Sequence, residues 1–217
     1  FKTRAGGTLK LQELIDQVKE EFVSMREDNQ NMDSEDLDKI VNAIIKFADL
    51  QNDLERNYIF DIKNFCTVNG KTGPYILYTY LRINKIITNT KAILSDKVYN
   101  ETDRNLRLKL LDVTNILNQA IKERKPHHIA NYLYELSVVA NNFYQTNKMS
   151  QLEGKNKEDF EIVLNLNNKI LKDLLNISNA SKIVIDKAIE AGKIDIGFAS
   201  YDKLIEENGK FKAMCSL

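Results

Sequence analysis

Apolar residues recur at helical spacing along most of this chain. In residues 102–125 they follow one another at steps of three or four, which keeps them on one side of an α-helix. This stretch contains Leu106, Leu110, Val113, Leu117 and Ile121. A helix with one apolar side must bury that side against other helices. The spacing therefore limits the chain to folds in which several amphipathic helices pack together.

Four further stretches show the same spacing, and three of them begin at a suitable residue. Asp33 and Ser34 can cap a helix, and Pro74 and Pro126 fit the first position of a helix, where their missing N–H has no cost. The apolar sides expected here contain Leu37, Ile40, Val41, Ile44 and Ala48; Leu77, Tyr80, Leu81, Ile83 and Ile87; Ile129, Leu133, Leu136, Ala140 and Phe143; and Phe160, Val163, Ile170, Leu171 and Leu174. We predict an all-α fold, a helix bundle.

The composition agrees with long helices. The 217 residues include only 8 Gly and 2 Pro, and 43% are hydrophobic, enough for a core. No apolar run could span a membrane, and no secretory leader opens the chain. Two cysteines, Cys66 and Cys215, cannot build a disulfide framework. We expect a cytoplasmic protein without membrane contact.

The two ends of the chain differ from the helical part. Residues 1–12 contain Gly6 and Gly7 and are typical of a loop. Beyond residue 177, a helix over 182–191 is followed by strand-like alternation over 193–199. We expect a short N-terminal loop and a small mixed appendage at the C-terminal end.

Charge is balanced overall but segregated. Residues 11–38 hold ten acidic and two basic side chains, whereas residues 71–128 hold eleven basic and five acidic ones. Nucleic-acid binding depends on a local basic face, so a net charge of zero does not exclude an RNA partner. Solvated helix faces explain the same segregation, and charge alone leaves both interpretations open.

One polar stripe in the helix after Pro74 carries two tyrosines followed by two cations. Tyr75, Tyr78, Arg82 and Lys85 lie at offsets of 3, 7 and 10, on one side of a helix. Phenol rings can stack on unpaired bases and cations can bind phosphates, as single-stranded RNA requires. Alternatively, the tyrosines rim the core and the cations are solvated.

The helix after Pro126 has a second polar face. His127, Asn131, Tyr134, Val138 and Asn142 share it, and Asn and Tyr can read base edges and stack. Tyr134 could equally bury its ring and bond to the backbone. The adjacent residues His127 and His128 point in different directions on a helix, so we expect no metal site.

Catalytic motifs are missing from the sequence. There is no G-x-S-x-G and no P-loop, and neither cysteine lies in a nucleophile context. The chain on its own does not have the pattern of an enzyme.

Several segments, in this order, resemble one family. Residues 1–11 are FKTRAGGTLKL, residues 72–80 are TGPYILYTY, and KPH at 125–127 precedes ANYLYEL at 130–136 and NFY at 142–144. These segments resemble the KMSKS-like signature loop and the DALR-type anticodon-binding domain of arginyl-tRNA synthetases. The resemblance covers about residues 1–177.

The resemblance implies a class I synthetase, which uses ATP with Mg to attach arginine to tRNA. It implies four parts: a signature-loop remnant at 1–12, a helical stem-contact segment at 13–70, the anticodon-binding helices at 71–177, and an unassigned tail at 178–217. The nucleotide-binding catalytic domain would lie upstream, so this fragment alone would be inactive and would hold no cofactor.

The resemblance also implies roles for particular residues. Lys2, Thr3 and Arg4 would face the ATP phosphates in the full enzyme. The partner would be arginine-accepting tRNA, contacted by Tyr75, Tyr78, Arg82, Lys85, His127, Asn131, Tyr134 and Asn142. Arginine and ATP would bind only through the catalytic domain, and we expect a monomer. The alternative is a helical protein-interaction module without RNA specificity, which could use the acidic surface within 13–38.

Overall fold

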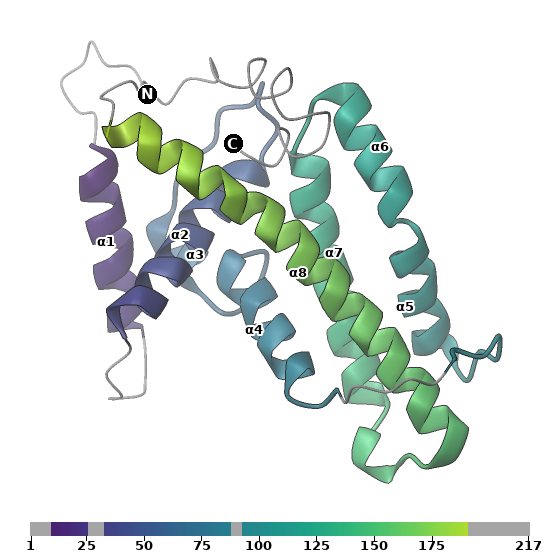
Figure 1. The fold of residues 1–217 in the computed structure, drawn as a ribbon. Helices are drawn as coiled ribbons and strands as arrows, with labels where there is room; N and C mark the ends of the chain where they lie inside the picture. The colour runs from purple at the N-terminus through teal and green to yellow at the C-terminus, as the bar shows by residue number, and fades with distance from the viewer. Residues whose placement is uncertain (1–9, 26–32, 88–92, 191–217) are drawn as a thin grey trace. The chain divides into compact units, whose positions relative to one another are not determined.

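A computed structural model describes residues 10–25, 33–87 and 93–190, with the backbone alone over 176–190 (Figure 1). All regular structure in these residues is helical, which confirms the predicted all-α class. The chain divides into two compact units, Phe1–Tyr78 and Thr79–Leu217. The strand-like alternation expected at 193–199 lies outside the described residues.

The first unit is built on three helices, α1 (Leu11–Ser24), α2 (Ser34–Leu50) and α3 (Ile62–Cys66). Helix α2 begins directly after Asp33, as predicted. The buried residues that these helices share are Val18, Phe22, Val41, Ile44 and Cys66. Burial, and to a lesser degree the charge of Glu21, raises the pKa of the Cys66 thiol to about 11. Cys66 is therefore a neutral core side chain at physiological pH.

The segment Thr72-Gly73-Pro74 fixes the start of α4 (Gly73–Asn84). The Tyr75 backbone N–H donates to the Thr72 hydroxyl at 3.2 Å, and that hydroxyl donates to the Thr67 carbonyl oxygen at 2.7 Å. A Cβ atom on Gly73 would lie 2.6 Å from the backbone oxygen of Ala43 in α2. Each residue of this motif therefore has a structural role. Thr72 caps the helix, Gly73 allows the close approach to Ala43, and Pro74 occupies an early helical position where a proline is tolerated.

The buried side of α4 agrees only in part with the one predicted from apolar spacing. Ile83 is fully buried as expected, but Leu81, also expected in the core, is 56% exposed. Ile76 and Thr79, which were not expected there, are fully buried. The difference arises because Thr79 takes a core position with its hydroxyl hydrogen-bonded to Asn141. A count of apolar residues alone misses a buried polar residue of this kind.

The second unit contains the end of α4 and the helices α5 (Glu101–Leu111), α6 (Val113–Glu123), α7 (His127–Thr146) and α8 (Gly154–Glu190), with a 3₁₀ turn at Met149–Gln151. The single helix expected over 102–125 is thus two helices. They meet at Asp112, whose carboxylate accepts a hydrogen bond from the Asn115 side chain at 3.1 Å. Such local polar bonds compete with a continuous helix.

Helix α7 lies at the centre of the second unit, in contact with α5, α6 and α8 (Figure 1). Its buried residues are Ile129, Ala130, Tyr132, Leu133, Leu136, Ser137, Ala140, Asn141 and Phe143. Phe143 packs edge-on against Phe160 of α8, with the ring centroids 4.7 Å apart. Helix α8 continues to Glu190, beyond the end expected near residue 177.

A buried carboxylate ties the segment before α5 to α8. Asp159 of α8 has a fully buried side chain. It accepts hydrogen bonds from the Ser95 backbone N–H and hydroxyl, from the Tyr99 hydroxyl at 2.8 Å, and from the Lys155 ammonium at 3.1 Å. Burial raises the pKa of Asp159, but these donors outweigh it and hold the pKa well below its usual range.

We predict that Gly73→Ala destabilises the protein by about 1–3 kcal/mol, since the new methyl group must push apart the backbones of α2 and α4. Denaturant unfolding measures this change. Asn84→Ala, at an exposed position of the same helix, is the matched control and should stay within about 0.5 kcal/mol of the unchanged protein. Equal effects of the two substitutions would contradict the close approach at Gly73.

We predict that protonation of Asp159 is one reason why the protein loses stability in acid. Its folded-state pKa is depressed, so its contribution is fully present above the unfolded value of about 4 and is lost as the pH falls below it. Thermal unfolding between pH 7 and pH 2 should show a shallower acid decline for Asp159→Asn than for the unchanged chain. Asp173→Asn, at an exposed position of α8, should leave the decline as it is; a shallower decline there as well would refute the assignment to Asp159.

Candidate nucleic-acid interface

The polar side of α7 is the core of the candidate interface. His127, Asn131 and Tyr134 are partly exposed and Asn142 is exposed, while the opposite side of the helix is buried. Val138, on the same face, is 39% exposed. The predicted spacing is therefore realised as one polar side of α7 that carries imidazole, amide and phenol groups, which can stack on bases and bond to their edges. The Nδ1 atom of His127 and the Oδ1 atom of Asn131 are buried, so only part of these two side chains reaches solvent.

The four residues of the predicted polar stripe of α4 are divided between the two units. Tyr75 and Tyr78 belong to the first unit, and Arg82 and Lys85 belong to the second. Tyr78 is 51% exposed and Lys85 is exposed, whereas Tyr75 and Arg82 are partly buried. Each unit thus presents part of the stripe to solvent.

Two contacts join α4 to α7 within the second unit. The Asn141 side-chain amide donates to the Thr79 hydroxyl, with Nδ2 and Oγ1 2.7 Å apart, and both residues are buried. One turn further along both helices, the Arg82 guanidinium lies 4.5 Å from the centroid of the Tyr144 ring. Since both pairs advance by three residues on each helix, α4 and α7 run in the same direction here.

These contacts bring the polar edges of the two helices together. Thr79 precedes Arg82 by three residues, and Asn141 follows Tyr134 by seven, so each lies along the polar edge of its own helix. A further bond, from Asn168 Nδ2 of α8 to the Tyr80 carbonyl oxygen at 3.0 Å, holds α4 from the other side. Arg82 is therefore held against the C-terminal part of α7, at Tyr144.

The two histidines have different surroundings. The His128 Nε2 atom lies 2.7 Å from the Glu123 carboxylate, and the His127 and His128 rings are 4.3 Å apart. The hydrogen bond with His128 lowers the pKa of Glu123. Among the residues that the structure describes, no group of three His, Cys, Asp or Glu side chains could hold a metal ion.

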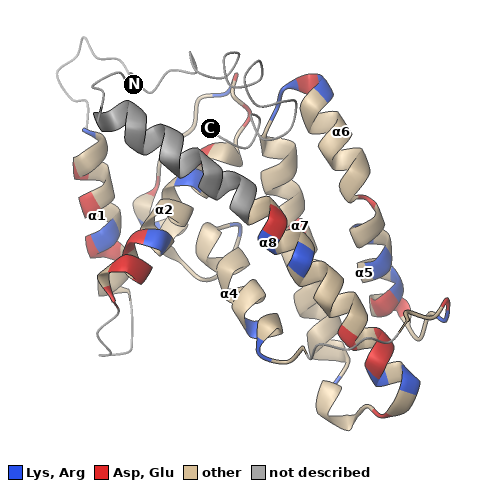
Figure 2. Ribbon diagram, viewed as in Figure 1, with Lys and Arg blue, Asp and Glu red and all other residues tan. Residues whose placement is uncertain are grey.

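Several cations of the basic region already have partners within the protein. Arg107 bonds to the buried Asp103 at 2.7 Å, and Lys109 bonds to Glu135 at 2.5 Å. Arg82 and Lys97 lie over aromatic rings. Figure 2 also shows the acidic residues along α1 and at the start of α2, where Lys19 pairs with Asp38. Asp103 is already counted among the acidic residues of this region, whereas Glu135 lies outside it, so the sequence count overstates the free basic charge by the Lys109–Glu135 pair.

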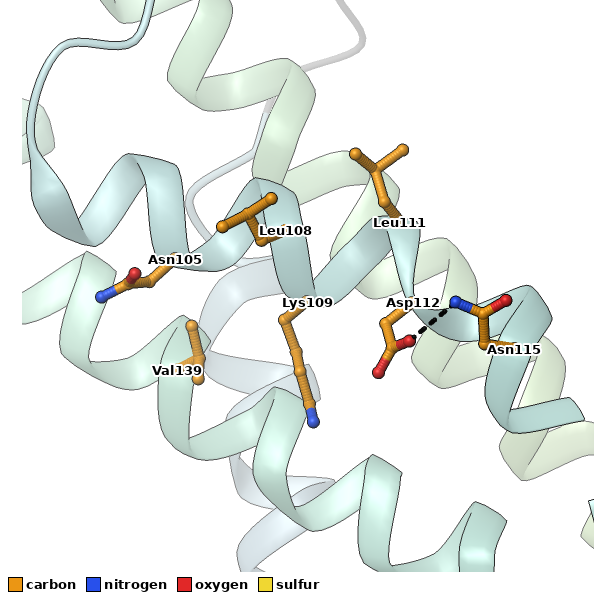
Figure 3. A pocket seen from close by; sticks show the side chains of 7 residues that line it. All are labelled: Asn105, Leu108, Lys109, Leu111, Asp112, Asn115 and Val139. Atoms are coloured by element: carbon orange, nitrogen blue, oxygen red, sulfur yellow. Dashed lines mark hydrogen bonds between the residues drawn. The ribbon is translucent and has the colours of Figure 1, made fainter. Parts of the chain in front are cut away.

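An open groove lies between α5, the start of α6 and α7 (Figure 3). Its volume is about 400 Å³, and it is lined by Asn105, Leu108, Lys109, Leu111, Asp112, Asn115 and Val139. Leu111 is 76% exposed. The ammonium group of Lys109 turns to Glu135, and the carboxylate of Asp112 accepts from Asn115, so both charges are already engaged.

Sequence reasoning missed three residues of this region. Asn141, Asn168 and Tyr144 join the helices of the second unit, but none was predicted to have a role. A signal existed for Asn141 alone, since it is a polar residue at the edge of the apolar side of its helix. Lys2, Thr3 and Arg4, predicted to face ATP phosphates, lie outside the described residues.

Comparison with known families matches both parts of the chain. The model of the DALR anticodon binding domain matches residues 76–195, and that of the class I (R) tRNA synthetase catalytic domain matches residues 1–62. Two relatives are arginine–tRNA ligases. That of Alkaliphilus oremlandii is 32% identical over 188 residues, covering 82% of this chain and 32% of the relative. That of Francisella tularensis subsp. tularensis is 34% identical over 193 residues, covering 82% and 33%.

Two solved structures share the fold. Arginyl-tRNA synthetase from Plasmodium falciparum aligns with a TM-score of 0.63 and 24% identity, over 76% of this chain and 31% of that one. The Thermus thermophilus enzyme aligns with a TM-score of 0.66 and 22% identity, over 76% and 30%. No helix within the described ranges is long and apolar enough to cross a membrane.

These comparisons confirm the predicted resemblance to arginyl-tRNA synthetases. The chain spans about a third of the length of the relatives that it matches. The matched DALR segment covers more than half of the chain. The chain therefore belongs to the DALR anticodon-binding domain family, and its relatives are arginine–tRNA ligases.

Proposed function

We propose that the chain is the tRNA-binding part of an arginine–tRNA ligase and recognises the anticodon stem-loop of arginine-accepting tRNA. The observation that carries this proposal is the polar side of α7, with Asn142 exposed and Asn131 and Tyr134 partly exposed. The partly exposed Arg82 of α4 belongs to the same unit. Amides can read base edges, phenols can stack, and a cation can bind a phosphate.

We propose a separate role in tRNA binding for each segment predicted from the sequence. Residues 13–70 contact the stem of the tRNA, and residues 71–177 bind its anticodon loop. Residues 178–217 have no assigned role. The exposed Tyr78 and the partly buried Tyr75 add stacking groups from the first unit, and His127 and Lys85 add polar contacts from the second.

Catalysis belongs to the longer protein. Similarity to class I synthetases implies that the whole enzyme uses ATP. We propose that ATP, with Mg, and arginine bind through an upstream catalytic domain and that Lys2, Thr3 and Arg4 then face the ATP phosphates. This chain alone would charge no tRNA. We further propose that it is monomeric and works in the cytoplasm, where its tRNA substrate is found.

We predict that Tyr78→Ala and Tyr134→Ala each weaken tRNA binding by about 1–3 kcal/mol, or roughly 5- to 150-fold, because each removes a ring that stacks on a base. Titration of the chain with arginine-accepting tRNA measures the loss, and the same tRNA with replaced anticodon bases tests specificity. Tyr78→Phe and Tyr134→Phe keep the ring and are the matched controls.

Different outcomes distinguish the two function classes. Unchanged affinity of both alanine variants would remove the tyrosines from the interface. Binding that ignores the anticodon would leave only a basic surface, and no binding of RNA would favour a protein-interaction module. Thermal unfolding of each variant separates a lost contact from a lost fold.

We predict that Arg82→Ala and Lys85→Ala each reduce the salt dependence of tRNA binding. A lost phosphate contact lowers the slope of log K against log salt by about 0.7–0.9. Lys39 of α2 lies in the proposed stem-contact segment but is not among the proposed contact residues, because its ammonium is held by Glu35 and Asp36. Lys39→Ala should therefore leave the slope unchanged. If all three variants change the slope equally, the effect reflects net charge and not local contacts.

A further inference from the structure

The Arg82–Tyr144 pair lies beside a buried, hydrogen-bonded contact between α4 and α7. Asn141 and Thr79 are 7% and 0% exposed, and their hydrogen bond fixes how the two helices pack. Three residues later on both helices, the Tyr144 ring lies under the Arg82 guanidinium. The position of the ring is therefore set by core packing and not by the surface.

An arginine that has to bind a phosphate benefits from such a support. A free Arg side chain has several rotatable bonds, and ordering them on binding costs affinity. A guanidinium stacked on an aromatic face keeps its N–H groups at the ring edge, where they remain able to donate to phosphate oxygens. Arg82 and Tyr144 are both partly exposed, so the stack borders solvent.

We propose that Tyr144 is a positioning residue of the RNA-binding surface: its ring holds the Arg82 guanidinium in the orientation that meets a tRNA phosphate. The inference rests on the proposed function, since it deepens the role of Arg82 there. Tyr144 acts through Arg82 and makes no contact with RNA itself. The Asn141–Thr79 hydrogen bond keeps the ring and the cation in register.

A double-mutant cycle on tRNA affinity tests this dependence. Tyr144→Leu removes the ring, keeps a large apolar side chain, and should weaken binding about 2- to 5-fold, the effect of losing one cation–π contact at a partly exposed site. In the Arg82→Ala background, the same substitution should cause no further loss. Tyr144→Phe keeps the ring and should bind as the unchanged chain does.

Nuclear magnetic resonance gives a readout that needs no RNA. In the free protein, the δ-methylene protons of Arg82 should be shifted upfield by the Tyr144 ring. This shift should disappear in Tyr144→Leu and persist in Tyr144→Phe. A role of Tyr144 limited to general stability would change the unfolding temperature without this pattern.

The outcomes separate the inference from the function that it rests on. Failure of the unchanged chain to bind tRNA would overturn the proposed function and this inference with it. Binding with equal losses for Tyr144→Leu in both backgrounds would keep the function and overturn the positioning role. Weakened binding by Tyr144→Phe would show that the hydroxyl and not the ring acts, and would also overturn it.

Discussion

The second unit depends on one constraint, the burial of one side of α7. Among Asp, Glu, Lys and Arg this helix has only Glu135. Its buried side is covered by α5, α6 and α8, and α4 is bonded to its edge through Asn141. Turning α7 about its axis would expose Tyr132 and Phe143 and leave polar groups inside. The direction of its polar side is therefore fixed by packing, and a recognition surface needs such a fixed orientation.

Much of this arrangement could be predicted from the sequence because it rests on local rules. Apolar spacing identified α2 and α7 and their buried sides, since period and capping act within a few residues. The same spacing indicated the polar strip from His127 to Asn142, because these residues lie on the side of the helix that the apolar residues leave free. The motif at residues 72–75 was noticed as a family resemblance, and the structure gives its physical reason in the close approach of Gly73 to Ala43.

The remaining features could not be predicted, because they depend on pairs that are distant in sequence. Thr79 is buried because Asn141, 62 residues later, bonds to it, and this bond moves the core side of α4 away from Leu81. Arg107 and Lys109 look like surface cations in the sequence, yet carboxylates of the same unit hold them. Tyr144 belonged to a recognised motif, but nothing in the sequence places Arg82 above its ring.

Contacts of Lys and Arg side chains within the protein also affect how the proposed RNA binding would work. The polar strip of α7 holds no Lys or Arg, and one cation of residues 71–128, Lys109, pairs with Glu135 outside that range. Diffuse attraction to phosphates is therefore weaker than the residue count implies. On the proposed function, affinity would come mainly from stacking, amide contacts and a few well-held cations. Under that condition the orientation of each cation matters more than their number, and a ring that supports Arg82 acquires a role that sequence charge alone would never indicate.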